Sequence, residues 1–471
     1  TQKLSSIAPK VVGGSLPARI GRRNANEKLP EMVAFFFKKM EMMLFIIGDY
    51  MRTSEIGRLI QVKQNRKLEA PYQNIGLAIE ANICQRCVSQ IDERWQLPSG
   101  ISYCWNCAIV GRLTEQDTLG TLNRGIHDGF ERPSGYYNWH GQLIEVQSRL
   151  VAKIIDGLQI GKDQLLHAVT GAGKTEMIYP ILKKYLDLDY RVAYVSPRIE
   201  VIRELAPRIM TYFHIEYAML HGEVKDNKLW TQLLFATTHQ MYKFYRAFDL
   251  IIVDEADAFP FKENRSLWYA LAQARSDKSR IIYMTATLST DLKWLIKMKQ
   301  VQLQQLFCRY HGFKIPNLQL ILIQNDWRQQ LPQHMIRQLQ KHSGHWLIFV
   351  PKISDLDLIA QQVEKYLPHC RMQCISSQTN KKEVIVDELK QNSLDIICTT
   401  ILLERGITIS NVQIIILDAD EGIYTDESLI QIAGRSGRDA RYPYGNIFVY
   451  CFERTKQLMK VIEAIDQLNA K

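Results

Sequence analysis

Residues 168–175 read Ala168-Val169-Thr170-Gly171-Ala172-Gly173-Lys174-Thr175, and they connect an apolar run to a long helical pattern. Strand, glycine-rich turn and helix in this order are what a P-loop requires, although Ala168 stands where the strict motif has glycine. In such a turn the backbone N–H groups and the helix N-terminus bind phosphate, and glycines permit the close approach. We therefore expect a nucleotide site in which Lys174 reaches the β- and γ-phosphates and the Thr175 hydroxyl ligates Mg²⁺. Its cofactor-binding residues are Thr170, Gly171, Ala172, Gly173, Lys174 and Thr175.

An apolar strand that ends in acids follows the P-loop at a distance of 79 residues, counted from Thr175 to Asp254. It reads Leu250-Ile251-Ile252-Val253-Asp254-Glu255-Ala256-Asp257. Asp254 at the strand tip is placed to hold Mg²⁺, and Glu255 is placed to orient and deprotonate the attacking water. Each motif alone has a simpler interpretation, a glycine turn without a ligand or a capped strand end. Together they predict an enzyme that hydrolyses a nucleoside triphosphate.

Short apolar runs alternate with helical stretches from about residue 160 onward, which is typical of buried parallel strands in βαβ units. The runs are Leu165–Val169, Arg191–Val195, Leu233–Ala236, Leu250–Val253, Arg280–Met284, Trp346–Val350, Arg371–Ile375, Leu394–Cys398, Val412–Leu417 and Asn446–Tyr450. They are too many for one compact sheet, so we predict an α/β fold with two lobes. The pattern is interrupted at Gly312–Asn317, where we place the seam.

A cysteine cluster precedes these lobes, and its spacing is C-x2-C-x16-C-x2-C. Two such knuckles close a tetrahedral Zn²⁺ site, and four thiolates leave no open position, so the expected role is structural. The alternative, four thiols in an ordinary core, fits poorly because residues 88–103 are polar. The predicted zinc ligands are Cys84, Cys87, Cys104 and Cys107. We interpret the other five cysteines as unpaired thiols.

These features divide the chain into four parts. Residues 1–75 form an N-terminal segment that we expect to be poorly ordered or partly non-native, with Met51 as an alternative start. Residues 76–140 hold the zinc-binding module and a linker, residues 141–315 the first lobe and residues 316–471 the second lobe.

Composition sets limits on the class of protein. With 46% hydrophobic and 23% charged residues, the chain has the composition of a globular protein and not that of a disordered one. No run of 18 apolar residues occurs, which excludes an integral membrane helix, and the absence of a cleavage motif after residues 42–47 argues against a secretory signal. The net charge of +10 is weak evidence for a nucleic-acid partner, because +6 of it falls in residues 1–80.

The motor motifs resemble those of superfamily 2 helicase-type ATPases over about residues 140–455. Further segments typical of that superfamily occur in the expected order. They are Ser196-Pro197-Arg198, Thr237-Thr238-His239-Gln240, Thr285-Ala286-Thr287, Thr399-Thr400-Ile401-Leu402-Leu403-Glu404-Arg405-Gly406 and Gln431-Ile432-Ala433-Gly434-Arg435-Ser436-Gly437-Arg438. The resemblance implies two RecA-like parallel-sheet lobes in tandem, with ATP between them.

The same resemblance implies roles for individual residues. Gln147 would read the adenine edge. Arg435 and Arg438, three apart and expected on one helix face, would reach the γ-phosphate and stabilise charge in the transition state; surface salt bridging is the alternative. Thr285 and Thr287 would couple the state of ATP to movement of the lobes. Residues suited to the phosphates of a nucleic-acid strand are Arg198, Thr237, Thr238, Thr399 and Thr400.

The choice between RNA and DNA depends on the later motifs. The letters of Asp254–Asp257 suggest a DEAD-box RNA helicase, but those enzymes usually begin the last motif with His-Arg, where this chain has Gln431-Ile432. They also favour Ser-Ala-Thr over Thr285-Ala286-Thr287. The forms found here are similar to those of DNA translocases such as the primosomal restart helicase. That helicase, however, carries its zinc cysteines between motor motifs, whereas Cys84–Cys107 precede the motor.

An N-terminal Cys₄ module followed by this motor resembles the late-competence ComFA family over about residues 80–465. The resemblance implies an ATPase that moves single-stranded transforming DNA into naturally competent bacteria. It also implies three protein partners: a phosphoribosyltransferase-like competence protein, a DNA-processing recombination loader and the membrane channel for DNA uptake. A cytoplasmic location follows, with a peripheral position on the inner membrane face as an implied option, and self-association stays open.

Two rival functions are considered, and the second of them differs in class from this one. A replication-restart or repair helicase of the primosomal type would lead us to expect further duplex-binding domains. A zinc-dependent DNA-binding or scaffolding protein with a vestigial ATPase is the second rival. Intact Lys174, Asp254, Glu255, Arg435 and Arg438 argue against the vestigial ATPase.

Overall fold

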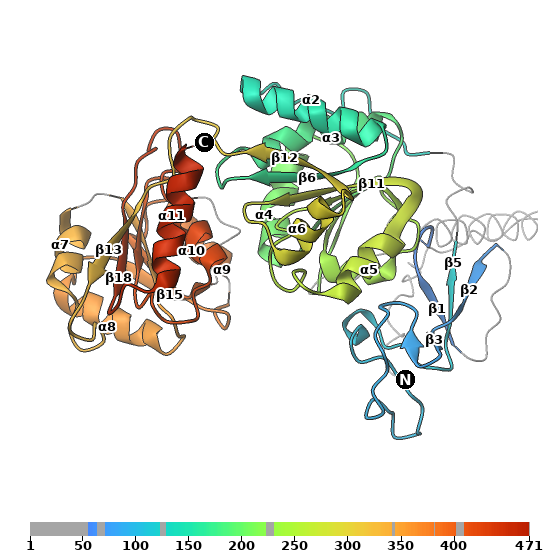
Figure 1. Ribbon diagram of the computed structural model, residues 1–471, viewed down its shortest axis with the longest axis horizontal. Helices are drawn as coiled ribbons and strands as arrows, with labels where there is room; N and C mark the ends of the chain where they lie inside the picture. Colours follow the sequence, from blue (N-terminus) through green and yellow to red (C-terminus); the bar gives the residue numbers. More distant parts are fainter. Residues whose placement is uncertain are drawn as a thin grey trace, which may run out of the picture. The chain divides into compact units, whose positions relative to one another are not determined.

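The structure is a computed structural model that describes residues 55–63, 71–122, 129–222, 230–341, 344–380, 382–401 and 409–470 (Figure 1). The expectations for residues 1–54, which include Met51, and for Leu402–Gly406 fall outside the described residues. Residues Glu55–Lys471 make up one compact unit. No helix among the described residues is both long and apolar enough to cross a bilayer.

The first lobe is built on a seven-stranded sheet in which every neighbouring pair is parallel. The strand order is β12-β6-β11-β10-β7-β9-β8. The strands are β6 (Asp163–Ala168), β7 (Val192–Ser196), β8 (Tyr217–Leu220), β9 (Leu233–Thr237), β10 (Phe248–Val253), β11 (Arg275–Thr285) and β12 (Val301–Leu306). Because the strands are parallel, their carboxyl ends meet at one edge of the sheet, where ligands of open α/β sheets bind.

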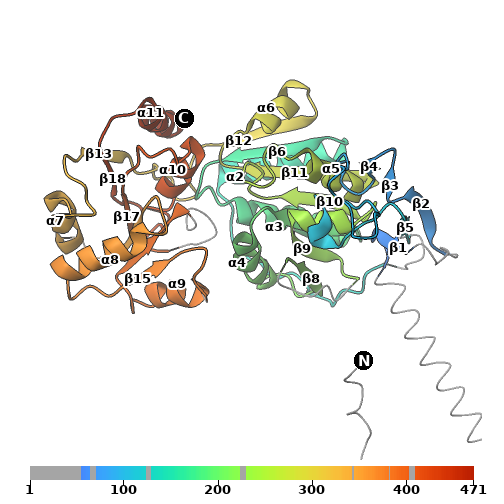
Figure 2. The same cartoon turned by 90° about the horizontal axis from the view of Figure 1, so that it is seen from below.

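Successive residues of the central strands pack into different apolar layers on the two faces of this sheet. In β10, Leu250 and Ile252 pack with the helices of one layer, and Ile251 and Val253 pack with those of the other. The first layer contains α2 (Glu145–Gln159), α3 (Lys174–Asp187) and α4 (Ile199–Met210). The second contains the short helix η3 (Thr238–Lys243), α5 (Arg265–Ala274) and α6 (Thr290–Lys297), and Figure 2 shows α3 and α4 together on one side of the sheet.

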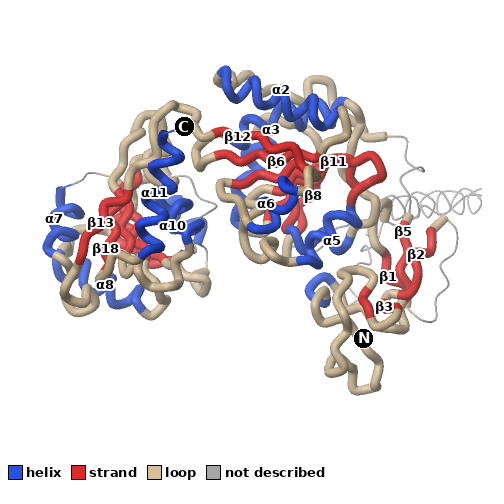
Figure 3. Tube along the Cα trace, viewed as in Figure 1, coloured by secondary structure: helices blue, strands red, loops and turns tan. Residues whose placement is uncertain are grey.

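The second lobe is a six-stranded sheet, also parallel throughout, in the order β13-β18-β17-β14-β16-β15. Its strands are β13 (Leu318–Leu322), β14 (His345–Phe349), β15 (Met372–Ile375), β16 (Ile396–Thr399), β17 (Val412–Ile416) and β18 (Ile447–Cys451). Helices α7 (Gln333–Lys341) and α8 (Asp355–Tyr366) cover one face. The other face carries α9 (Lys382–Lys390), α10 (Asp426–Ala433) and α11 (Lys456–Ala470), so that strands are flanked by helices in both lobes (Figure 3).

The ten strands predicted from the apolar runs are all confirmed. Within the described residues of the two lobes, three strands were not predicted: β12 and β8 are the edges of the first sheet, and β13 is an edge of the second. Edge strands face water along one side, so their sequences need no continuous apolar run. The predicted seam at Gly312–Asn317 lies between β12 and β13.

The zinc-binding module has its own small antiparallel sheets. Strands β1 (Ile60–Val62), β5 (Thr118–Thr121) and β2 (Gln73–Leu77) form one sheet in that order, and β3 (Ile79–Glu80) pairs with β4 (Ile83–Cys84). The larger sheet thus draws strands from both sides of the boundary at residue 75 that the sequence suggested. The module is not a separate core, because its cysteines, Leu113 and Leu119 belong to the same apolar cluster as Met241, Tyr242 and Phe244 of the first lobe.

The second lobe also contains a buried ion-pair network around Arg328. The guanidinium binds both carboxylate oxygens of Asp355 at 2.9 and 3.0 Å and contacts Asp418 at 2.8 Å. Trp327 donates its indole N–H to Asp418 at 2.9 Å. Asp355 and Asp418 are 3% and 2% exposed, so neither carboxylate can be rehydrated in place if the arginine is lost.

We predict that Arg328→Met destabilises the second lobe, because two carboxylates would stay buried without a cation. Breaking a buried pair costs about 3 kcal/mol or more, which corresponds to roughly 6–12 °C in the unfolding midpoint of a lobe of this size. Thermal unfolding followed by circular dichroism measures the change. Arg371→Met is the matched control, since Arg371 pairs with the half-exposed Asp395, and it should leave the midpoint nearly unchanged. Equal midpoints for both variants would contradict this account of the network.

Candidate functional site

A cavity of about 530 Å³ lies at the carboxyl edge of the first-lobe sheet and also contacts second-lobe residues. It is lined by every residue that the sequence predicted to bind or hydrolyse the nucleotide. Those residues are Gln147, Thr170, Gly171, Ala172, Gly173, Lys174, Thr175, Asp254, Glu255, Arg435 and Arg438. Segments far apart in the sequence therefore contribute to one site.

The phosphate-binding turn lies between β6 and α3, as the motif requires. Gly173 is the N-cap of α3 and has φ 75°, a backbone conformation that is unfavourable for residues other than glycine. A Cβ at this position would also lie 2.4 Å from the amide nitrogen of Gln147. Lys174 begins the helix and donates to the carbonyl of Ala168 at 3.0 Å. The lysine is thus held over the turn, with its ammonium beside the space that phosphates would occupy.

Gln147 connects the start of α2 to this turn. Its amide nitrogen donates to the Ala172 carbonyl at 2.7 Å, and its amide oxygen accepts from the Ile144 N–H at 3.0 Å. The side chain is 3% exposed. One of its two N–H groups is thus used by the Ala172 carbonyl, and among the described residues the other has no acceptor, so it can serve as a donor in the cavity.

The acids after β10 face the lysine. Asp254 accepts from the Tyr194 hydroxyl at 2.9 Å and from the Glu255 N–H at 2.9 Å. Burial raises the pKa of Asp254, and the positive charge of Lys174 opposes that rise. Burial likewise lowers the pKa of Lys174, while Asp254, Asp257 and Glu255 act in the opposite direction. The donor set suits a hard cation: Thr175 and Asp254 would hold Mg²⁺, which prefers oxygen ligands.

Arg435 and Arg438 come from the second lobe. Helix α10 ends at Ala433, so Arg435 lies in the turn that follows it and Arg438 directly after that turn, and the expectation that they share a helix face is wrong. The residue that ends the helix lies against the P-loop: a Cβ on Gly434 would lie 1.8 Å from the Thr170 hydroxyl, so only glycine fits there. Burial lowers the pKa of Arg438, and the negative charge of Glu204 offsets part of that effect.

The Thr-Ala-Thr segment links the acids to the end of β11. Thr287 donates its hydroxyl to Asp257 at 2.6 Å, and the Thr287 N–H donates to the Thr285 hydroxyl at 3.1 Å. Thr285 itself donates to the Thr287 carbonyl. His167 of the neighbouring strand β6 contacts the Ala286 carbonyl at 3.1 Å. A movement of the Asp257 side chain would therefore displace the segment Thr285–Thr287 through this hydrogen bond.

The residues suited to a nucleic-acid backbone follow carboxyl ends of strands in both lobes. Arg198 is the N-cap of α4, Thr237 ends β9, and Thr400 follows β16; all three are partly exposed. Thr238 and Thr399 are fully buried, and their hydroxyls have no hydrogen-bond partner among the described residues. In this conformation only the first three present side chains to solvent.

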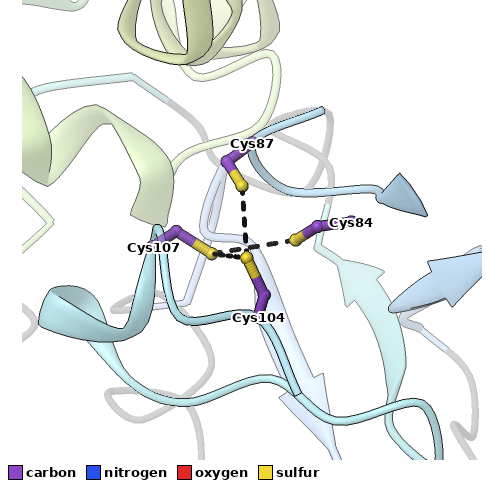
Figure 4. A group of neighbouring side chains, drawn as sticks. All are labelled: Cys84, Cys87, Cys104 and Cys107. Atoms are coloured by element: carbon purple, nitrogen blue, oxygen red, sulfur yellow. Dashed lines mark hydrogen bonds between the residues drawn. The ribbon is translucent and has the colours of Figure 1, made fainter. Parts of the chain in front are cut away.

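The four cysteines of the N-terminal module converge (Figure 4). Their sulfurs lie within 4.8 Å of one another, with separations of 3.7 Å for Cys84–Cys107, 3.5 Å for Cys87–Cys104 and 3.6 Å for Cys104–Cys107. Sulfurs at about 2.3 Å from a tetrahedral Zn²⁺ lie about 3.8 Å apart. The residues present therefore fit a Cys₄ zinc site.

Arg86, inside the first knuckle, is directed at one of these sulfurs. Its Nε and Nη2 atoms lie 3.2 and 3.1 Å from the Cys107 sulfur, and Nη2 donates to the Cys107 carbonyl at 2.8 Å. The side chain is 6% exposed. Two N–H groups aimed at one thiolate would stabilise the net negative charge of a Zn(Cys)₄ centre.

A polar chain connects the second knuckle to the first lobe. Asn106 donates to the Ser89 hydroxyl at 2.8 Å and to the Ser266 hydroxyl at 3.1 Å. Ser266 is hydrogen-bonded to the Tyr242 hydroxyl at 2.6 Å. Tyr242 belongs to η3, which begins at Thr238, so the zinc module is fastened to a segment that carries predicted nucleic-acid contacts.

Sequence reasoning missed several of these residues. Arg86 lies between predicted zinc ligands, and a basic residue inside a knuckle is a signal that could have been used. Tyr194 lies in a predicted strand, but nothing in its spacing indicates that its hydroxyl reaches Asp254. Ser266 and Tyr242 carry no motif at all.

Two family models match the lobes. Residues 144–295 match the DEAD/DEAH box helicase family, and residues 327–440 match the helicase conserved C-terminal domain. These domains imply an ATPase of superfamily 2 that uses ATP and Mg²⁺, and they suggest nucleic-acid binding.

Curated relatives cover more of the chain. Competence protein ComFA of Streptococcus pneumoniae is 33% identical over 394 residues, which are 82% of this chain and 90% of the relative. The chain belongs to the ComFA family. ComFA of Bacillus subtilis is 30% identical over 82% of this chain and 85% of its own length.

Further relatives and solved structures match a smaller share of the chain. Replication restart protein PriA of Rickettsia prowazekii is 25% identical over 34% of this ComFA-family chain and 27% of its own length. Among solved structures, Saccharomyces cerevisiae Dbp5 bound to RNA and ADP BeF3 has a TM-score of 0.51 at 14% identity, over 69% of this chain and 91% of its own. Helicase Lhr of Mycobacterium smegmatis, bound to ssDNA and AMP-PNP, has a TM-score of 0.53 at 16% identity, over 70% of this chain and 50% of its own. These structures establish the RecA-like fold of both lobes.

We predict one Zn per chain in the purified protein and its loss in the double variant Cys84→Ala/Cys87→Ala, because two thiolates cannot close a tetrahedral site. Elemental analysis by mass spectrometry measures the metal content. The matched control is Cys370→Ala/Cys374→Ala, which changes two cysteines outside the cluster and should retain the metal. An unchanged zinc content in Cys84→Ala/Cys87→Ala would exclude this site.

We also predict that Arg86→Gln keeps the Zn stoichiometry but weakens its retention about 10- to 100-fold, the usual cost of losing an outer-shell partner. Competition with a chromogenic chelator gives the affinity. Arg94→Gln is the control, because Arg94 lies in the same module but pairs with Asp92 on the surface. If both variants release zinc as wild type does, Arg86 has no role in holding the metal.

Proposed function

We propose that this ComFA-family chain is an ATP-dependent motor that translocates along single-stranded DNA and helps to drive uptake of transforming DNA during natural competence. The observation that carries the proposal is that the P-loop, the acids after β10 and two second-lobe arginines line one cavity. Such a composite site can hydrolyse ATP only in a particular relation of the lobes, so hydrolysis can be coupled to their movement.

The roles in hydrolysis follow from the contacts. The turn Thr170–Thr175 would bind the phosphates, and Lys174 would move from the Ala168 carbonyl to the γ-phosphate. Mg²⁺, when bound by Thr175 and Asp254, neutralises charge on the phosphates. Glu255 adjoins Asp254 and lines the cavity, where it would orient the water and accept its proton.

The second-lobe arginines would complete the site. Arg435 and Arg438 would stabilise the charge that develops on the transferred phosphoryl group. Gln147 would use its remaining N–H to recognise the adenine. Thr287, through its hydrogen bond to Asp257, would relay loss of the γ-phosphate to the segment Thr285–Thr287.

Contacts with the DNA strand are assigned to the carboxyl ends of strands in both lobes. Arg198, Thr237 and Thr400 would contact phosphates directly. Thr238 and Thr399 are buried here, so they would take part only after a local rearrangement of η3 or of the chain after β16. A strand held by both lobes would advance as the lobes approach and separate.

Membership of the ComFA family supports DNA uptake as the process served, since the relatives are named competence proteins. By the same resemblance we propose a cytoplasmic location and three partners: a phosphoribosyltransferase-like competence protein, a DNA-processing recombination loader and the membrane uptake channel. We make no assignment of the oligomeric state, which light scattering on the purified protein would measure.

The deciding experiment measures ATP hydrolysis without nucleic acid and with single-stranded DNA, duplex DNA or RNA. We expect single-stranded DNA to stimulate the rate most, and Lys174→Ala to lower kcat about 100-fold or more, since one donor to the transition state is worth that much. Lys183→Ala is the matched control: it lies on the same helix α3, pairs with Asp187 and does not line the cavity. Stimulation by RNA alone would exclude the DNA motor, and turnover independent of Lys174 would exclude the ATPase site.

A second candidate is a replication-restart or repair helicase of the primosomal type. The similarity to PriA favours it, although that similarity covers 27% of the relative. The two functions differ in whether a fork is opened. Unwinding of a labelled forked duplex, dependent on Lys174, would favour the restart role, and movement along single strands without unwinding would favour uptake.

A further inference from the structure

Arg309 is buried between the lobes, in the segment that joins β12 to β13. Its side chain is 1% exposed, which is rare for an arginine. It belongs to none of the helicase motifs identified in the sequence and does not itself line the cavity. A charged side chain in such a place requires a physical explanation.

The guanidinium of Arg309 binds the segment that carries the two cavity arginines. It donates to the carbonyls of Ser436 at 2.9 Å, Gly437 at 2.6 Å and Gly434 at 3.3 Å. These carbonyls belong to the turn after α10, which contains Arg435 and precedes Arg438. Three hydrogen bonds from one planar group fix the path of this turn more firmly than single contacts would.

The other side of Arg309 packs on the P-loop. A Cβ built on Gly171 would lie 3.5 Å from Cγ, Cδ and Nε of Arg309, which is ordinary van der Waals contact. The next residue, Tyr310, donates its backbone N–H to the Gly171 carbonyl at 3.0 Å. Arg309 therefore lies between the phosphate-binding turn of one lobe and the arginine-bearing turn of the other.

The buried charge of Arg309 is stabilised mainly by the turn after α10. Among the described residues, the hydrogen-bond partners of Arg309 are backbone carbonyls alone, and its Nε has none. Those carbonyls lie at the C-terminal end of α10, where the helix dipole favours a cation. Burial, and secondarily the charge of Arg438, lowers the pKa of Arg309 to about 10, so the side chain stays cationic at neutral pH. The stabilisation of the cation depends on the turn being in place, because no carboxylate of the described residues is hydrogen-bonded to Arg309.

We propose that Arg309 is the positioning residue that holds the turn Gly434–Arg438 against the P-loop and so aligns Arg435 and Arg438 for catalysis. The inference rests on the proposed function, in which those two arginines act on the phosphoryl group. Arg309 contacts neither substrate nor reacting atoms; it acts through the turn.

This role affects the chemical step more than the binding of ATP. The two arginines stabilise charge that develops only in the transition state, and a misplacement of about 1 Å can cost 100-fold in rate. Loss of such an interaction lowers kcat and leaves KM nearly unchanged. Loss of a residue that merely supported the fold would instead lower the fraction of folded enzyme, and the remaining folded enzyme would have the kcat of wild type.

The test is a double-variant cycle on ssDNA-stimulated hydrolysis with Arg309→Met and Arg438→Ala. Each single variant should lower kcat, Arg309→Met by about 10- to 100-fold, with KM for ATP within about twofold of wild type. The double variant should lose clearly less than the product of the two single losses, because the part of the Arg309→Met effect that acts through Arg438 is already gone, while Arg435 can still be misplaced. Independent effects that multiply in the double variant would overturn the proposal.

Arg328→Met is the matched control, since Arg328 is a hydrogen-bonded arginine of the second lobe that lies outside this turn. It should lower the unfolding midpoint, yet its effect on kcat, if any, should multiply with that of Arg438→Ala. Arg309→Lys keeps the charge and loses the planar fork, so it should restore only part of the rate. If Arg309→Met does not fold, the same cycle with Arg309→Lys decides the matter.

The failure of this inference and of the proposed function can be told apart. If Arg438→Ala hydrolyses ATP at the wild-type rate, the assignment of the second-lobe arginines fails. If Arg438→Ala is impaired but Arg309→Met is not, only the role of Arg309 fails.

Discussion

The buried ammonium group of Lys174 needs nearby carboxylates, and this requirement determines how the first lobe is arranged around the P-loop. Lys174 faces Asp254, Asp257 and Glu255, and burial opposes its charge. Charges can be kept out of water only where neighbours or hydrogen bonds compensate them, so cation and acids must come together. The parallel sheet achieves this because β6 and β10 end at the same edge. The same edge leaves a cavity into which a polyphosphate would fit, and Arg435 and Arg438 of the second lobe line that cavity, where they would balance the added negative charge.

The part of the structure that sequence predicts well is the part with repeated local signals. Buried parallel strands must be apolar throughout, so every central strand was found, whereas β8, β12 and β13 at the sheet edges were missed. The P-loop residues and the acids were predicted from motifs that follow the ends of β6 and β10. These two strand ends meet at one edge because the strands are parallel.

The part that sequence predicts poorly depends on exact burial and on backbone partners. Thr238 and Thr399 have the right chemistry for phosphate contacts, but pattern gives no indication that they are buried. Arg435 and Arg438 were expected on one helix face, but the helix ends before them, at Ala433, and Gly434 then packs against Thr170 of the other lobe. Arg309 binds carbonyls, which every residue possesses, so no sequence feature marks its partners.

The zinc module shares its apolar cluster with Met241, Tyr242 and Phe244 of the first lobe. Although the module precedes the first lobe in the sequence, the two are therefore not separate folding units. A fragment that began after the module would leave this apolar surface facing water, and exposed apolar surface of that kind promotes aggregation. The metal-binding segment and the first lobe should therefore be kept together when such motors are truncated or recombined into chimaeras. A substitution in one of them must remain compatible with the packing of the other.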